Sequence, residues 1–235
     1  MSSPQRDHTF FRSMAIIIAV VVFAGFARTY GSPLLDGTST VPWIIHVHAV
    51  VFSAWLLLFV VQTTLIGRDR VALHKTVGTA AMFLAALMVI VGVGTAITMA
   101  RLGHRGIPGV EFPDPEGFLL LNIMAIAVFS VLIAAAWVYR RKPQIHKRLM
   151  LMATASSLVG PGVSRLPIVS GNTPAIAILV LSFLLAGPIY DLVTRRRIHP
   201  AYVVGVVLGF LSAPPVVMAI GATGAWHSIA AWMMR

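Results

Sequence analysis

Seven long apolar stretches occupy most of the chain, and they constrain its fold more than any other feature. Each approaches the roughly 20 residues that an α-helix needs to cross a bilayer. The stretches cover about residues 10–29, 42–66, 76–100, 118–139, 148–167, 174–194 and 201–221. The sequence therefore predicts an all-α, polytopic membrane helical bundle with about seven transmembrane helices.

The segments between these stretches are too short to bury a core of their own. We therefore expect a single integral membrane domain over residues 1–235. Within it, residues 1–12 are predicted to be a cytoplasmic N-terminal segment. Residues 222–235, which include Trp226 and Trp232, are predicted to be an interfacial tail, because tryptophan favours the membrane–water interface.

The distribution of basic residues predicts the orientation of the bundle. Thirteen of the 18 lysines and arginines lie in segments 1–12, 67–75, 140–148 and 195–199, which all fall on the same side of the predicted membrane. Cytoplasmic loops are enriched in these residues, so we expect the N-terminus inside and the C-terminus outside. The net charge of +11 then reflects topology, and the expected partner is the lipid bilayer and not nucleic acid.

The first apolar stretch also allows a second interpretation. Its basic start, the apolar run from Met14 and the small residues Gly25 and Ala27 resemble a cleavable signal peptide. Cleavage would remove the first helix and leave the predicted orientation of the others unchanged.

Two histidines are predicted to meet at the inner side of the membrane. His74 and His146 each stand at the inner end of an apolar stretch, so they can lie at the same depth. Two imidazoles at one depth can be the axial ligands of a haem b iron between facing helices. Asp191 lies at a similar depth and is a candidate to orient a ligand imidazole, with Arg195, four residues on, as its alternative partner. The alternative without a cofactor is that both histidines are solvated or bind lipid phosphate.

One stripe of the second predicted helix carries polar and aromatic residues. His48, Trp55 and Gln62 are spaced seven residues apart and so share one face of a helix. An amide in the membrane needs a partner, so this face is expected to point into the bundle, with Asn122 as a candidate neighbour of Gln62. Hydrogen bonds that serve only helix packing explain the stripe equally well.

His46 and His48 form a His-x-His pair that resembles a metal chelate. On a helix, however, two residues correspond to about 200° of rotation, so the rings point to nearly opposite sides. We therefore expect His48 to be the inward ligand of a cofactor or metal. His46 is expected to support it or to lie at the interface, close to Trp43.

Arg165 is a further costly polar residue, placed near the outer end of the fifth stretch. It follows the run Gly160, Pro161, Gly162, which predicts a break in that helix. Pro188 and the pair Pro214 and Pro215 predict two more breaks. Broken helices line the binding sites of many transporters, although proline is also ordinary in membrane helices.

The common signatures of enzymes are absent from the sequence. It contains no HExxH, no nucleotide-binding glycine loop and no serine-nucleophile elbow. It also contains no cysteine, so a redox centre here has neither thiolate ligands nor a covalent haem link. Whether the protein is an enzyme stays open at this point.

Several short segments resemble those of known membrane proteins. The run from His46 through Trp55 and Gln62, the turn to His74, the segment His146-Lys-Arg-Leu-Met, and Tyr190-Asp191 through His199-Pro200 resemble an uncharacterised family of bacterial multi-pass membrane proteins. This resemblance implies the inner (plasma) membrane of a bacterium. The histidines at helix ends also resemble, more distantly, cytochrome b561-type haem proteins and assembly factors of haem-copper oxidases. The fourth predicted helix has no histidine to match His48, which departs from the two-haem pattern.

These features favour a protein that binds haem or a metal through histidines, in membrane electron transfer or in the maturation of a respiratory complex. The principal alternative is a small-solute permease or channel lined by Gln62 and Asn122. A third is a structural subunit that packs in a membrane complex or a homo-oligomer.

Overall fold

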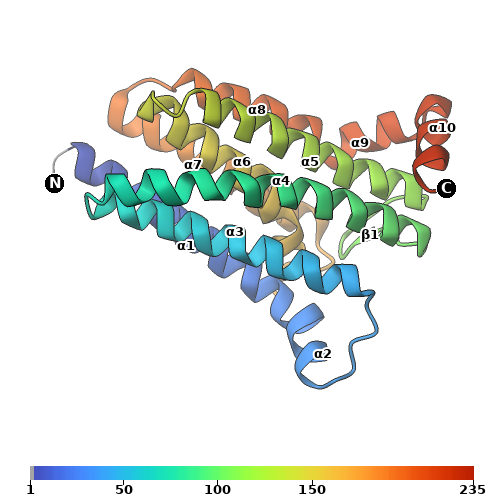
Figure 1. Ribbon diagram of the computed structural model, residues 1–235. Helices are drawn as coiled ribbons and strands as arrows, with labels where there is room; N and C mark the ends of the chain where they lie inside the picture. The colour runs from blue at the N-terminus through green and yellow to red at the C-terminus, as the bar shows by residue number, and fades with distance from the viewer. Residues whose placement is uncertain (1–2) are drawn as a thin grey trace.

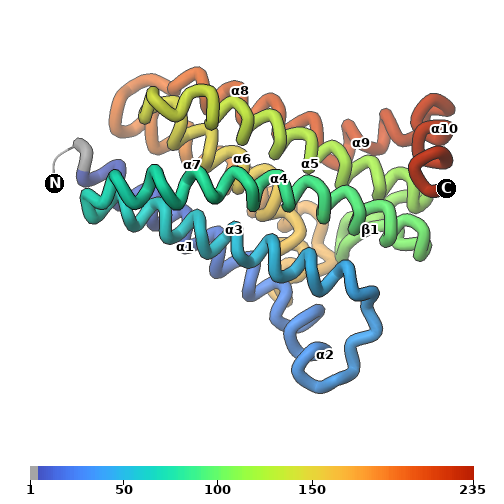
Figure 2. The backbone as a smooth tube through the Cα atoms, viewed as in Figure 1, coloured from blue at the N-terminus to red at the C-terminus, as the bar shows by residue number. Residues whose placement is uncertain are grey.

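The computed structural model describes residues 3–235 as an elongated bundle whose long helices run along roughly one direction, with α10 lying across one end (Figures 1 and 2). The elements are α1 (Ser3–Phe26), a π-helical turn η1 (Ala27–Gly31), α2 (Ser32–Leu35), α3 (Trp43–Gly67), α4 (Val71–Arg101), β1 (Gly106–Ile107), β2 (Val110–Glu111), α5 (Pro115–Val138), α6 (Pro143–Ser164), α7 (Thr173–Arg195), α8 (Pro200–Leu211), α9 (Pro214–Gly221) and α10 (Gly224–Met233). The predicted all-α bundle is confirmed.

The helices can cross a membrane in most of the predicted places. Five helical segments of the described chain are long and apolar enough to span a bilayer: Gln5–Leu35, Trp43–Gly67, Val71–Arg101, Pro115–Val138 and Thr173–Arg195. The pair α8 and α9, bent by 47° at its junction, makes a sixth candidate span. The predicted fifth span is helical as α6, but it is less apolar than the others, because its first turns carry Gln144, His146, Lys147 and Arg148.

α6 is less apolar because it lies in the centre of the bundle. It packs against α1, α5, α7 and α8, and most of its length is buried. Polar side chains are tolerated at membrane depth where protein and not lipid surrounds them. The position of α6 therefore explains how a helix with three basic or imidazole side chains in a row can belong to a membrane domain.

Proline breaks only one of the three predicted helices. Pro161 and Pro188 lie inside continuous helices, so the breaks predicted there are wrong. Neighbouring helices and nearby side chains can satisfy the backbone around a proline in a membrane bundle. Pro214, in contrast, begins a new helix after Ser212 and Ala213, which produces the bend between α8 and α9.

The glycine next to Pro161 has a packing role. At Gly25 an added Cβ would overlap the backbone carbonyl of Gly162, and at Gly162 it would lie 2.8 Å from the Cα of Val22. Only glycine allows the backbones of α1 and α6 to approach this closely, as small residues do at many membrane helix crossings. Gly162 thus marks a tight helix crossing at the place where a break was predicted.

The two ends of the bundle differ in their connections (Figure 1). We call the end with α1's start and the α3–α4, α5–α6 and α7–α8 turns the inner end, following the predicted orientation. The opposite, outer end carries the β1–β2 hairpin and α10. The predicted interfacial tail is mostly α10, and Trp226 of this helix is buried and donates a hydrogen bond to the carbonyl of Glu116 at 2.8 Å. The tail is therefore packed on α5.

Candidate functional site

His74 and His146 are neighbours at the inner end of the bundle. His74 lies in the first turn of α4 and His146 in the first turn of α6. Their ring centres are 6.4 Å apart and the ring planes are inclined by 79°. Both side chains are partly buried. The two imidazoles that the sequence placed at one depth therefore face a common space between helices.

The protonation of His146 is fixed by its hydrogen bond. Its Nδ1 lies 2.8 Å from the carbonyl oxygen of Ala136, near the end of α5. A carbonyl can only accept, so Nδ1 carries the hydrogen and donates it. The other nitrogen, Nε2, is then left with its lone pair. A histidine that ligates a metal through Nε2 usually has this arrangement.

Gln62 of α3 is the hydrogen-bond partner of the His74 ring. In the amide orientation that satisfies all of its neighbours, Gln62 donates to Nδ1 of His74 and, at 3.2 Å, to the His74 carbonyl, while its oxygen accepts from the Gly78 amide at 3.0 Å. This orientation puts the imidazole hydrogen on Nε2. The opposite orientation would place the amide oxygen at Nδ1 and free Nε2. Asn122, the expected partner of Gln62, instead donates to the Phe118 carbonyl of its own helix at 2.8 Å.

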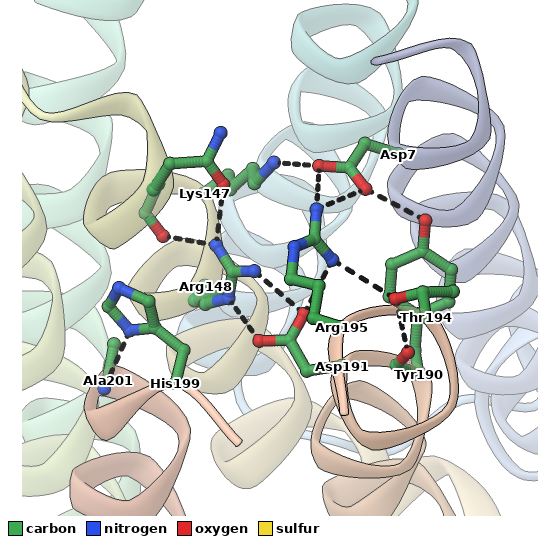
Figure 3. Close-up of polar contacts among 10 residues, drawn as sticks. Asp7, Lys147, Arg148, Tyr190, Asp191, Thr194, Arg195, His199 and Ala201 are labelled. Carbon is green, nitrogen blue, oxygen red and sulfur yellow. Dashed lines mark hydrogen bonds and ion pairs between the residues drawn. The ribbon is translucent and has the colours of Figure 1, made fainter. Parts of the chain in front are cut away.

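A buried ion pair joins α6 and α7, and its Arg148 follows His146 by two residues in α6 (Figure 3). Arg148 binds Asp191 with two hydrogen bonds, from Nε at 2.8 Å and from Nη2 at 2.7 Å. The two side chains are 1% and 0% exposed, so the pair is fully removed from solvent and lipid. Two parallel hydrogen bonds of this kind fix both groups in direction as well as in distance.

Asp7 extends the network to α1. Both of its oxygens accept from Nη2 of Arg195 at 2.7 Å, and one also accepts from the Tyr190 hydroxyl at 2.8 Å. Lys147 is ion-paired with the same carboxylate. Arg195 then links the two acids, because its Nη1 donates to Asp191 at 2.8 Å. As Figure 3 shows, two carboxylates and three cations join α1, α6 and α7 in one cluster.

The structure corrects the expected role of Asp191. It was predicted to orient a ligand histidine, but its oxygens are occupied by Arg148 and Arg195. The alternative partner, Arg195, is the correct one, and the carbonyl of Ala136 orients His146 instead. Sequence reasoning missed Arg148, Lys147 and Asp7. Their signal was charge in and beside apolar stretches, where ionised side chains need partners.

The outer-end histidines do not form a pair. His46 is hydrogen-bonded to the Tyr30 hydroxyl at 2.8 Å, whereas His48 stacks on Phe52 with ring centres 3.8 Å apart. The Nδ1 of His48 is buried and has no hydrogen-bond partner in the described part of the chain. The rings thus contact different neighbours, as expected for residues two apart on a helix.

The remaining predicted polar residues serve packing contacts. Trp55 is buried, and its indole donates to Thr154 of α6 at 3.3 Å. Arg165 donates to the Pro161 carbonyl at 2.9 Å and lies 4.5 Å from the ring centre of Phe26. Neither residue contacts the His74 and His146 pair through any hydrogen bond in residues 3–235.

One further group of possible metal ligands lies at the outer end. Over residues 3–235, only Asp114, Glu116 and His227 bring three His, Asp or Glu ligand atoms within 4.8 Å of one another. Asp114 is already used as the N-cap of α5, where it accepts from the Gly117 amide at 2.7 Å. His46, His48, His74 and His146 belong to no such group.

Comparison of the chain with protein-family models, curated proteins and solved structures found no match. The helices that are long and apolar enough to span a bilayer indicate a membrane-embedded helical protein.

Proposed function

We propose that the protein binds haem b at the inner end, with His74 and His146 as axial ligands, and carries electrons within a bacterial inner membrane. The observation that carries this proposal is the 6.4 Å separation of the two rings. Two imidazoles on opposite sides of one metal, with metal–nitrogen distances of about 2.0–2.1 Å, have ring centres about 6–6.5 Å apart.

The number of ligands favours haem over a free metal ion. A zinc site usually takes three or four protein ligands, whereas haem iron needs only two, because the porphyrin supplies the others. Within residues 3–235, no third His, Asp or Glu joins the pair at ligand distance. When bound, haem supplies reversible one-electron chemistry.

The residues around the pair fit this role in different degrees. His146 already has the required tautomer, with Nδ1 donating to Ala136 and Nε2 free. His74 needs its hydrogen on Nδ1, so Gln62 must present its carbonyl oxygen there and give up its contacts to the His74 carbonyl and the Gly78 amide. The proposal therefore makes Gln62 the residue that sets the basicity of His74.

The test is an optical spectrum of the purified full-length protein, oxidised and dithionite-reduced, after expression with ample haem. We expect a Soret band that shifts on reduction, at close to one haem per chain, and its loss in His74→Ala and His146→Ala. His104→Ala, an exposed histidine of the outer loop, is the matched control and should leave the spectrum unchanged.

Two further measurements separate ligand loss from misfolding. Circular dichroism reports whether the alanine variants keep their helix content. His74→Met retains a possible iron ligand and should shift the low-spin signal without removing the haem. Reduction of the wild-type haem by a quinol in lipid nanodiscs tests electron transfer. A colourless wild type, or unchanged spectra in both alanine variants, overturns the proposal.

A further inference from the structure

A cavity of about 710 Å³ opens at the inner end, next to the ion-pair network. Residues from the start of α1, the start of α6 and the end of α7 surround it. The lining residues are Arg6, Asp7, Gln144, Tyr190, Thr194, Arg195 and Arg197. Neither His74 nor His146 borders this cavity, so it is separate from the proposed haem site.

The charge of the lining is strongly positive. Three guanidinium groups face one carboxylate, that of Asp7. Both oxygens of Asp7 are already engaged by Arg195, and Lys147 and Tyr190 bind the same group. The carboxylate is therefore neutralised by its own partners. The cavity retains uncompensated positive charge, which favours an anionic ligand.

Arg6 and Arg197 are the groups available to such a ligand. Both side chains are exposed, and neither has an ion-pair or hydrogen-bond partner among the described residues. Arg195 differs, because its two contacts to Asp7 and Asp191 hold it in place while 28% of its side chain stays exposed. Arg195 is thus already fixed at the cavity and adds no ordering cost, whereas Arg6 and Arg197 are free to close on a ligand and are ordered when it binds.

We propose that this cavity binds a phosphate group, with Arg6 and Arg197 donating hydrogen bonds to its oxygens and Arg195 contributing its positive charge. Guanidinium groups bind phosphate oxygens with paired, charge-assisted hydrogen bonds. The cavity lies at the level expected for the inner headgroups, where basic pockets between helices bind anionic lipids. The phosphate can come from such a lipid headgroup or from a soluble phosphorylated compound.

The test compares two double variants in lipid nanodiscs by thermal unfolding. Arg6→Gln with Arg197→Gln removes the two unpaired cations of the cavity. Arg68→Gln with Arg70→Gln removes the same charge from the exposed α3–α4 turn and is the matched control. Each protein is titrated with inorganic phosphate in a zwitterionic lipid, against chloride at equal ionic strength, and is separately placed in nanodiscs with added phosphatidylglycerol.

We expect a ligand to raise the unfolding temperature of the wild type, and the cavity variant to weaken its apparent affinity roughly tenfold or more. The control variant should stay within about twofold. Stabilisation by inorganic phosphate identifies a soluble ligand, whereas stabilisation only by phosphatidylglycerol identifies a lipid headgroup. The proposal is overturned if neither probe stabilises the wild type or if both double variants weaken binding equally. Because the cavity excludes the histidines, the haem spectrum should be unchanged in both variants.

Discussion

Arg148 and Arg165 lie near opposite ends of the same helix and are held in two different ways. Arg148, at the inner end, is 1% exposed and is bound by the carboxylate of Asp191. Arg165, at the outer end, has no carboxylate partner in the described chain and uses the Pro161 carbonyl and the face of Phe26, while part of it stays exposed. A guanidinium can be fully enclosed when a carboxylate meets it, whereas without one it must stay near the membrane surface.

The histidines show the same contrast between the two ends. At the inner end, His74 and His146 each have a fixed hydrogen-bond partner and lie beside each other. At the outer end, His46 and His48 contact separate aromatic residues, and Nδ1 of His48 has no hydrogen-bond partner within the part of the chain that the structure describes. Every ion pair in the described chain also lies at the inner end. The inner end therefore carries the organised polar chemistry of the molecule.

Asp191→Asn is expected to have the largest effect. Among residues 3–235 it removes the only carboxylate that Arg148 contacts, and it leaves a buried guanidinium without that counter-charge. The loss of one partner of a buried pair typically costs about 3–5 kcal/mol, so most of this variant should be unfolded at temperatures that the wild type withstands. The measurement is the free energy of unfolding in mixed micelles.

Asp69→Asn supplies the control, because Asp69 is exposed in the α3–α4 turn and asparagine tolerates its positive φ of 58°. A second variant, Arg148→Met with Asp191→Leu, removes both charges and should recover much of the lost stability. A loss below about 1 kcal/mol for Asp191→Asn would show that the backbone and side-chain oxygens of Gln144 alone can accommodate the charge of Arg148.

His48→Phe is expected to have a smaller effect of opposite sign. Phenylalanine keeps the stacking on Phe52 and removes a buried nitrogen without a partner, so the protein should gain up to about 1 kcal/mol of stability. The comparison is His146→Phe, measured in haem-free protein. This change removes the hydrogen-bond donor of the Ala136 carbonyl and should lower the free energy of unfolding by about 1–3 kcal/mol. If His48→Phe is as destabilising as His146→Phe, the outer histidine has a ligand or water as its partner and the contrast between the ends fails.

His199, in the turn between α7 and α8, gives the smallest expected effect, as a dependence on pH. Its Nδ1 accepts a hydrogen bond from the Ala201 amide at 3.1 Å and so caps α8. Burial, together with the nearby positive charge of Arg148, lowers the pKa of His199 below its ordinary value of 6.5. The folded state then binds this proton less tightly than the unfolded state does, so stability is full above pH 6.5 and falls as the pH drops toward the lowered pKa.

His199→Asn tests this effect, because asparagine caps a helix without titrating. Unfolding temperatures are compared at about pH 8 and about pH 5.5. The wild type should lose slightly more stability between the two than the variant. An equal loss in both proteins would assign the pH dependence to other groups.

The helices could be predicted from the sequence because the bilayer fixes their length and apolarity. The exceptions are informative. α6 begins at Pro143, five residues before the predicted stretch, because its polar first turn is covered by other helices and not by lipid. Pro161 did not end this helix, while Pro214 did begin a new one. Proline alone does not decide between these outcomes, because the tertiary environment of each site determines whether the backbone is satisfied.

The candidate site could be predicted only in part. The proximity of His74 and His146 followed from depth, since both lie in the first turns of helices that begin on the same side. The partner of Arg148 could not be predicted in this way. Asp191 is 43 positions away in the sequence, and the local sequence does not show which helices are neighbours in the bundle. Charge matching was the available signal: of the seven acidic residues, Asp7, Asp69 and Asp191 lie at the inner end, and of these Asp7 and Asp191 stand within helices. Lys147 and Arg148 need counter-charges at that end.

The two contacts of α1 with α6 together determine its alignment. Asp7 and Gly25 are separated by 18 residues, which is five full helical turns, so both lie on one face of α1, about 27 Å apart. One binds Lys147 and the other abuts Gly162. A slide by a single residue would rotate α1 by about 100° and would misplace both contacts at once. The first helix therefore has a single register against α6. Any translation along its axis or rotation about it would break at least one of the two contacts.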